Sequence, residues 1–235
     1  MHKIRGFTLL EVLLVSLLGS LLLLAATELL ASLSQQQARN YAQLRLQDKA
    51  RLADLAISRD ITTATAVLAV GAASQPYPNR SVTSVDLGGF DLAATGFNQF
   101  RSSDWLFMKK GNNSEPDYSL WHLDEKTHGF GLAHKGLSRE NSDSLTASQT
   151  LVDQVELLRF RFYCSDQKRW LTASEATIYS SITHVHFAFL LTSPVSIKAK
   201  SRSIELWDEI LQPPDDGHLR LLVTGIRALR EEEDE

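Results

Sequence analysis

The sequence predicts an α+β protein in which one long N-terminal helix packs against an antiparallel β-sheet head domain. Three observations predict this fold. The chain begins with a strongly apolar run, the run continues as a polar segment with helical periodicity, and the pattern after Gly71 changes to the period of two that is typical of strands. The chain has 235 residues, of which 43% are hydrophobic, and both values are ordinary for one or two globular domains.

The apolar run from Leu9 to Leu24 contains ten leucines together with Val12 and Val15. At roughly 0.5 kcal/mol for each such residue, the run favours membrane insertion by about 5 kcal/mol or more. Glu11 lies inside the run and costs about 2.5–3.5 kcal/mol on the same scale, so the segment still inserts. Because a carboxylate inside a membrane segment is costly, Glu11 is a candidate functional residue.

A cut after Gly6 would supply a partner for this carboxylate. Phe7 would then carry a new α-amine, which is cationic near neutral pH because such amines have a pKa of about 7.7–8.0. Four residues of helix rise about 6 Å, a separation that suits pairing with a neighbouring helix displaced along the axis rather than within one chain. We therefore expect Glu11 to pair with the Phe7 amine of another subunit.

These residues resemble the class III signal of type IV prepilins and pseudopilins. Gly6 matches the position before the prepilin peptidase cut, Phe7 the residue that becomes N-methylated, and Glu11 the fifth mature residue, which is used in assembly. Lys3 and Arg5 match the basic leader. The resemblance implies a leader at 1–6 that is removed between Gly6 and Phe7, and a mature chain that is added to a filament.

Two other interpretations of the N-terminus stay open. A conventional cleaved signal peptide has a shorter apolar region that ends in a cleavage site of small residues. In this chain the apolar region continues to about Leu33, and only Ala25-Ala26 could serve as such a site. A plain single-pass anchor explains the hydropathy but not the Gly-Phe-x-x-x-Glu spacing. A permanent anchor of that kind would suit a membrane-anchored periplasmic enzyme or scaffold protein, and these remain the alternative functions.

The charge distribution predicts how the chain is oriented. His2, Lys3 and Arg5 precede the apolar run and the next cation is Arg39, so we expect a single-pass inner-membrane protein with a cytoplasmic N-terminus and a periplasmic head. Membrane lipid is therefore a predicted partner. The formal net charge is −4, so no nucleic-acid partner is predicted.

The polar segment after the apolar run keeps a helical stripe of apolar residues. No Pro or Gly occurs from Ser20 to Val70, which predicts one continuous helix with a membrane or assembly half at 7–33 and a periplasmic half at 34–70. The stripe consists mostly of small residues, which favours packing against a sheet over a free coiled coil. Its members are Ala38, Ala42, Leu46, Ala50, Ala53, Ile57 and Ile61.

The β-rich head is predicted from 71 to 230, followed by a solvated acidic tail at 231–235. The break from Gly71 to Asn79 contains two prolines. Alternation predicts strands at Ser81–Leu87, Trp105–Lys109, Tyr118–Leu123, Val155–Cys164, Ile182–Leu191, Val195–Ile204 and Leu219–Arg227. In the fourth strand, one face would carry Val155, Leu157, Arg159, Arg161 and Tyr163, and the other Leu158, Phe160 and Phe162.

Parts of the head are similar to PilW-like minor pilins and to J-type minor pseudopilins of type II secretion. The segment 151–163 with Trp170 is similar to both groups, and the segment 216–227 resembles the C-terminal strand of the PilW-like group. This resemblance implies a minor subunit at the initiation or tip of a type IV pilus or a type II secretion pseudopilus. The implied partners are the prepilin peptidase, other minor pilins or pseudopilins, the major pilin and the inner-membrane assembly platform. The sequence does not choose among twitching, adhesion, DNA uptake and secretion.

We found no pattern that predicts catalysis, a cofactor or a metal, so the protein is not expected to be an enzyme. The glycine-rich stretch from Gly129 to Gly136 is interpreted as a loop rather than a phosphate site. His184 and His186 share a strand face without a third ligand, and are interpreted as solvated polar residues. The oxygen-rich segments 112–117 and 215–216 are interpreted as turns rather than calcium sites.

The cysteine and the tryptophans are interpreted as structural. Cys164 is the single cysteine, so it cannot form an internal disulfide and is expected to be a small buried residue. The four tryptophans are expected in the core or at subunit contacts rather than as stacking platforms for nucleobases. They are Trp105, Trp121, Trp170 and Trp207.

Overall fold

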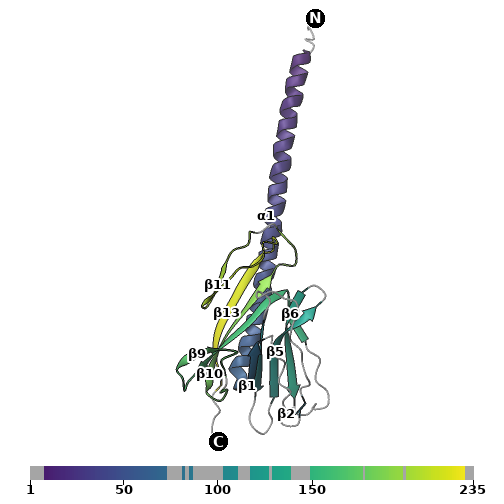
Figure 1. Cartoon of the computed structure of the whole chain (residues 1–235). Helices are drawn as coiled ribbons and strands as arrows, with labels where there is room; N and C mark the ends of the chain where they lie inside the picture. Colours follow the sequence, from purple (N-terminus) through teal and green to yellow (C-terminus); the bar gives the residue numbers. More distant parts are fainter. Residues whose placement is uncertain are drawn as a thin grey trace. The chain divides into compact units, whose positions relative to one another are not determined.

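The computed structural model describes residues 8–72, 81–82, 85–86, 103–110, 117–126, 129–138, 149–176, 178–197 and 200–230. The chain divides into two compact units, residues 1–43 and 44–235, and each is described by itself. The helix α1 (Leu9–Thr63) forms almost all of the described part of the first unit and opens the second (Figure 1).

The second unit contains two antiparallel sheets, with the strand orders β1-β4-β5-β6-β7 and β13-β10-β8-β9. The first sheet consists of β1 (Ala64–Ala72), β4 (Asp104–Lys110), β5 (Asp117–Lys126), β6 (Gly129–Ser138) and β7 (Gln149–Asp153). The second consists of β8 (Val155–Cys164), β9 (Arg169–Thr172), β10 (Ile182–Thr192) and β13 (Arg220–Ala228). Two short hairpins join β2 (Ser81–Val82) to β3 (Val85–Asp86) and β11 (Ile204–Leu206) to β12 (Glu209–Leu211).

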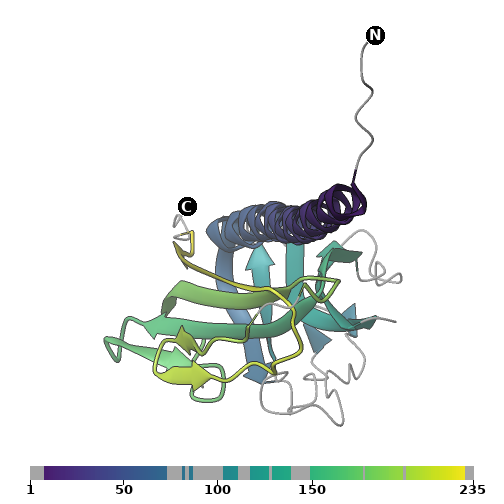
Figure 2. The ribbon, with the colours of Figure 1, turned by 90° about the horizontal axis from the view of Figure 1, so that it is seen from above.

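The C-terminal part of α1 supplies one wall of the main core. Five residues of the predicted stripe are buried there: Leu46, Ala50, Ala53, Ile57 and Ile61. They share one hydrophobic cluster with side chains of both sheets, such as Trp121 of β5 and Phe187 of β10, and Figure 2 shows this part of α1 lying beside the strands. The predicted fold class, a long N-terminal helix packed on antiparallel β-structure, is confirmed.

The helix ends at Thr63, seven residues before the predicted boundary at Val70, and the chain enters β1 directly. The hydroxyl of Thr63 donates to the carbonyl oxygens of Arg59 and Asp60, which closes the last turn. The β-branched residues that follow, such as Val67, favour extended backbone, and β1 pairs with β4. The absence of Pro and Gly would have allowed the helix to continue to Val70. Residues 64–72 form β1 instead, because they pair with the distant strand β4.

Most of the predicted strands are confirmed as β4, β5, β8, β10 and β13. The strand predicted at Val195–Ile204 is wrong, because the described residues before β11 pair with a loop instead. Ile197 donates its backbone N–H to the carbonyl oxygen of Gly217, and Ser201 donates its own to Asp215. The described part of the strand predicted at Ser81–Leu87 forms the β2–β3 hairpin.

The face assignment in β8 is correct except at its first residue. Val155 packs in the main core beside Leu158, whereas Leu157 belongs to a small cluster on the opposite face of the sheet. The pairing register with β10 shifts between Leu157 and Val155, so a β-bulge at Glu156 moves Val155 to the other face. Strict alternation could not anticipate this extra residue.

The predicted loop from Gly129 to Gly136 is wrong, because these residues belong to β6, which pairs with both β5 and β7. Gly131 has a structural reason to be glycine: a Cβ there would lie 2.3 Å from the Cγ2 of Thr150 in β7. Close approach of the neighbouring strand therefore explains a glycine that the sequence pattern assigned to a turn. The alternation pattern also did not predict β1, β7, β9 and the β11–β12 hairpin.

The chain passes from the first sheet to the second at Gln154, a non-glycine residue with φ 64° between β7 and β8. A residue in the left-handed region turns the backbone sharply, so two strands that are adjacent in sequence join different sheets. The second sheet carries the main core on one face. Its opposite face is partly covered by the β11–β12 hairpin.

Candidate functional site

The candidate site of the N-terminal unit is the first turn of α1, where Glu11 is exposed. Thr8 and Glu11 form a reciprocal capping box. The backbone N–H of Thr8 donates to Oε2 of Glu11 at 2.9 Å, the Thr8 hydroxyl donates to the same oxygen at 3.2 Å, and the Glu11 N–H donates to Oγ1 of Thr8 at 3.3 Å. Gly6 and Phe7 lie outside the described residues.

This geometry gives Glu11 a local partner that the sequence analysis missed. The signal was present, because Thr8-Leu9-Leu10-Glu11 fits the pattern of a Thr N-cap followed three residues later by Glu. Two neutral donors lower the cost of placing the carboxylate near lipid, but they leave its negative charge without a counter-charge. The capping box therefore orients the charge of Glu11 without neutralising it.

The remainder of the first unit is an exposed apolar helix. Leu9, Leu22 and Leu30 expose 82%, 72% and 65% of their surface, and the helix is long and apolar enough to cross a membrane. Three of its hydroxyl groups are satisfied within the helix, since Ser16, Ser20 and Thr27 each donate to the carbonyl oxygen three residues earlier. This segment buries almost no apolar surface within its own chain and suits a lipid or helical environment.

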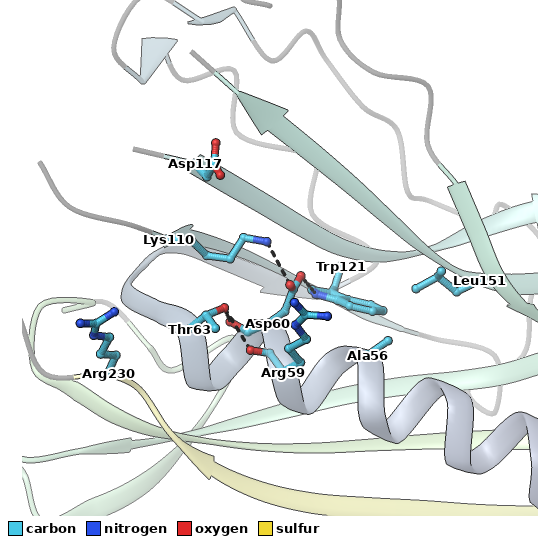
Figure 3. A pocket seen from close by; sticks show the side chains of 9 residues that line it. All are labelled: Ala56, Arg59, Asp60, Thr63, Lys110, Asp117, Trp121, Leu151 and Arg230. Atoms are coloured by element: carbon cyan, nitrogen blue, oxygen red, sulfur yellow. Dashed lines mark hydrogen bonds and ion pairs between the residues drawn. The ribbon is translucent and has the colours of Figure 1, made fainter. Parts of the chain in front are cut away.

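Polar side chains of the second unit gather around a surface pocket of about 550 Å³ at the end of α1 (Figure 3). Asp60 lies at its centre. Its Oδ1 accepts from Nζ of Lys110 at 2.9 Å and its Oδ2 accepts from Nε1 of Trp121 at 3.0 Å. The carboxylate thus ties the last turn of α1 to β4 and β5. The other lining residues are Ala56, Arg59, Thr63, Asp117, Leu151 and Arg230.

A second carboxylate, Asp104 at the start of β4, is buried at the contact between the two sheets. Its Oδ2 accepts the backbone N–H of Phe160 in β8 at 2.9 Å, and its Oδ1 lies 3.5 Å from Nη1 of Arg159. Burial raises the pKa of Asp104 to about 6, and this effect outweighs the opposing influence of Arg159. Asp104 therefore joins the sheets and titrates near neutral pH.

The residues considered for metal binding have other partners. His184 contacts Thr183, and His186 accepts a hydrogen bond from Trp207. Asp216 pairs with Arg220, whose hydrogen bonds lower the pKa of Asp216 to about 2. Within the described ranges, no group of three or more His, Cys, Asp or Glu side chains is placed to hold a metal. Residues 112–116 lie outside those ranges.

Cys164 and two of the tryptophans are buried, as expected. Cys164 is free and fully buried, with its Sγ 2.7 Å from the hydroxyl oxygen of Ser181. Trp105 and Trp121 belong to the interior, whereas Trp170 is 38% exposed and Trp207 is half-buried at a hairpin turn. The sequence could not separate these two pairs, since burial depends on which strand faces meet.

Comparison with known proteins identifies the N-terminal segment. Residues 1–27 match the family model described as the prokaryotic N-terminal methylation motif. The chain carries this methylation motif. The matched residues include Gly6, Phe7 and Glu11, and the match overlaps the start of the helix that is long and apolar enough to cross a membrane.

No curated protein matches the chain. Among solved structures, a type IV-like pilin from Thermus thermophilus is similar to it at 15% sequence identity, with a TM-score of 0.49. The comparison covers 79% of this chain and 97% of that one.

Proposed function

We propose that the protein is a minor pilin or pseudopilin subunit of a type IV pilus or a type II secretion pseudopilus. The observation that carries the proposal is the methylation motif at residues 1–27, which overlaps the start of an exposed apolar helix whose first turn holds Glu11. The prepilin peptidase would cut between Gly6 and Phe7 and methylate the new amine of Phe7. The subunit would act in initiation or at the tip, with other minor subunits, the major pilin and the assembly platform as partners.

The proposed mechanism uses the charge that the capping box leaves unneutralised. Before assembly the mature subunit stands in the inner membrane, with its N-terminus cytoplasmic and its head periplasmic. The Thr8 donors hold the Glu11 carboxylate in a fixed direction at the start of the helix. A neighbouring subunit that presents its Phe7 amine neutralises this charge, and the attraction is strong because lipid and packed helices screen it little.

A second carboxylate marks the other end of the proposed span. Glu28 follows Glu11 by 17 positions, which corresponds to a rise of about 26 Å, close to the roughly 30 Å thickness of a bilayer core. We therefore place Glu28 near the periplasmic membrane surface and Glu11 inside the bilayer core, close to its cytoplasmic edge. This placement would let Leu13, Leu17 and their neighbours meet the acyl chains before assembly and other helices after it.

The first experiment replaces Glu11 with Gln, which keeps a hydrogen-bond acceptor for Thr8 and removes the charge. We expect normal insertion and processing but loss of filament assembly, measured as sheared surface filaments or as secretion of a reporter. Glu28→Gln is the matched control, because it removes a carboxylate from the same helix at the opposite end. Normal assembly by the Glu11→Gln protein would contradict the electrostatic mechanism.

The second experiment tests processing directly. Mass spectrometry of the protein isolated from membranes is expected to find an N-terminal peptide that starts at methylated Phe7. Replacement of Gly6 by Leu should leave the uncleaved precursor, visible as a slower band on a gel. An unmodified N-terminus in the wild-type protein would favour the alternative of a permanently anchored enzyme or scaffold.

A further inference from the structure

The β11–β12 hairpin covers part of the outer face of the second sheet. Leu206 and Leu211 of the hairpin are buried against three residues of β8 and β10, namely Leu157, Ala188 and Leu190. These residues form a small cluster separate from the main core. The hairpin therefore shields an apolar strip that would otherwise face solvent.

The turn of this hairpin is strained at Trp207. Leu206 pairs with Glu209, so Trp207 and Asp208 form a two-residue turn, and Trp207 has φ 56°. Glycine adopts this left-handed conformation freely, whereas a side chain with a Cβ meets steric resistance there. Contacts of the indole ring must therefore hold Trp207 in place.

Those contacts converge on His186. The indole N–H of Trp207 donates to Nε2 of His186 at 3.1 Å, and the two rings meet edge-on with centroids 4.8 Å apart. The guanidinium of Arg161 lies 4.7 Å from the centre of the indole ring, and it also donates to Asp208 of the same turn at 2.7 Å. An imidazole side chain and an arginine thus fix the hairpin to the sheet.

The chemistry of the indole group determines the protonation state of His186. Since the indole nitrogen can only donate, Nε2 of His186 must accept, and the imidazole must be neutral with its proton on Nδ1. A second proton would convert Nε2 into a donor facing another donor. It would also place a positive charge beside Arg161, to which Asp208 is already bound.

We propose that His186 is a pH-sensitive latch that holds the β11–β12 hairpin on the sheet when neutral and releases it when protonated. Its surroundings offer little to stabilise an imidazolium ion. Trp170 of β9 packs edge-on at 5.6 Å, Ile226 of β13 is its strand partner, and His184 lies two residues away on the same face. The hairpin's other carboxylates, Glu205 and Glu209, are exposed.

The direction of the pH effect follows from the fold. Burial, and secondarily the charge of Arg161, lower the pKa of His186 below its ordinary value. Neutral His186 therefore stabilises the closed hairpin fully above about pH 6.5, and this stabilisation is lost as the pH falls through the lowered pKa of His186 in the closed form. Release would expose Leu157, Ala188 and Leu190.

The test uses amide hydrogen exchange of the full chain in detergent micelles, from pH 8 to pH 5. After correction for the intrinsic rate, we expect residues 204–211 to open roughly three- to tenfold more often at pH 5, as loss of one hydrogen bond predicts. Asp104 acts in the opposite direction over this range, because acid stabilises the fold through it.

Two matched variants separate the latch from general effects of acid. His186→Gln retains an acceptor for Trp207 without a titrating group, so its hairpin should stay closed at pH 5. His184→Gln removes a histidine from the same face that does not contact the hairpin turn, and it should respond as the wild type does. Equal acid opening in His186→Gln and wild type, or no opening in wild type, would overturn the proposal.

Discussion

The two units of this chain differ in how far their apolar side chains are exposed. In the first unit, leucines from Leu9 to Leu33 remain about half or more exposed, whereas in the second even a side chain as large as Trp121 is 1% exposed. In the head, the apolar side chains are buried against other elements of the same unit. Within the residues that the structure describes, nothing covers the apolar part of α1 in the first unit, so lipid or other helices would be needed to remove it from water.

This difference predicts that the two regions fail in different ways. Changes in the head should lower the free energy of unfolding and leave N-terminal processing intact. Changes in the first turns of α1 should affect assembly and leave the head stable. The following substitutions test that separation, and unfolding is followed by tryptophan fluorescence of the full chain in non-ionic detergent.

The largest effect on stability is expected for Phe187→Ala. Phe187 is fully buried, stacks on Phe189 with ring centroids 6.2 Å apart, and fills the space beside Gly225, where a Cβ would lie 2.5 Å from its ring. Removal of such a side chain should cost about 3–5 kcal/mol in urea unfolding. Ile226→Ala, at a 48% exposed position on the adjacent strand, should cost far less. Loss of Phe7 methylation in Phe187→Ala would break the proposed separation.

Asp104→Asn should remove a pH dependence. The pKa of Asp104 is about 6 in the folded state and 3.8 in an unstructured peptide. Protonation of Asp104 therefore stabilises the fold fully below pH 3.8, and this contribution to the free energy of unfolding is lost as the pH rises through 6. The loss amounts to about 3 kcal/mol. Asn can still accept the N–H of Phe160, so the stability of the variant relative to wild type should increase by about 2 kcal/mol from pH 4 to pH 6.5. A constant difference would show that Asp104 does not titrate in this range.

Asp60→Asn should have a smaller effect. It leaves Lys110, whose side chain is 20% exposed, without the negative charge that it contacts, and weakens the link between α1 and the first sheet. We expect a cost of about 1–2 kcal/mol in urea unfolding at pH 7. The control is Asp117→Asn, because Asp117 lines the same pocket and is exposed. Equal costs for the two variants would mean that the pairing with Lys110 contributes little.

The smallest effect is expected for Thr8→Val. This change keeps the shape of the N-cap residue and removes the hydroxyl that bonds the Glu11 N–H. It should cost about 1 kcal/mol locally, seen as roughly fivefold faster exchange of the Glu11 amide in micelles. Thr8→Ser should restore the bond. The unfolding curve of the head should not move, and a shift would mean that the two regions are coupled.

The sequence predicted the helix, its buried stripe and the strands with regular alternation, because these depend on local periodicity. It failed where a distant partner decided the outcome. Pairing of β1 with β4 ended the helix at Thr63, and a bulge moved Val155 to the opposite face of the sheet. The glycine-rich segment became strand β6 because it pairs with β5 and β7. The capping box of Thr8 and Glu11 was local, and its spacing pattern could have revealed it.

The sequence alone determined the methylation motif and the apolar helix, since a processing signal and membrane insertion depend on contiguous residues. Only the tertiary structure decided which polar groups became buried partners. Asp104 meets Phe160 across 56 positions, and Trp207 meets His186 across 21, and no periodicity encodes such distances. Burial changes the energy of a charge or a hydrogen bond, and it exists only after the strands have paired and packed.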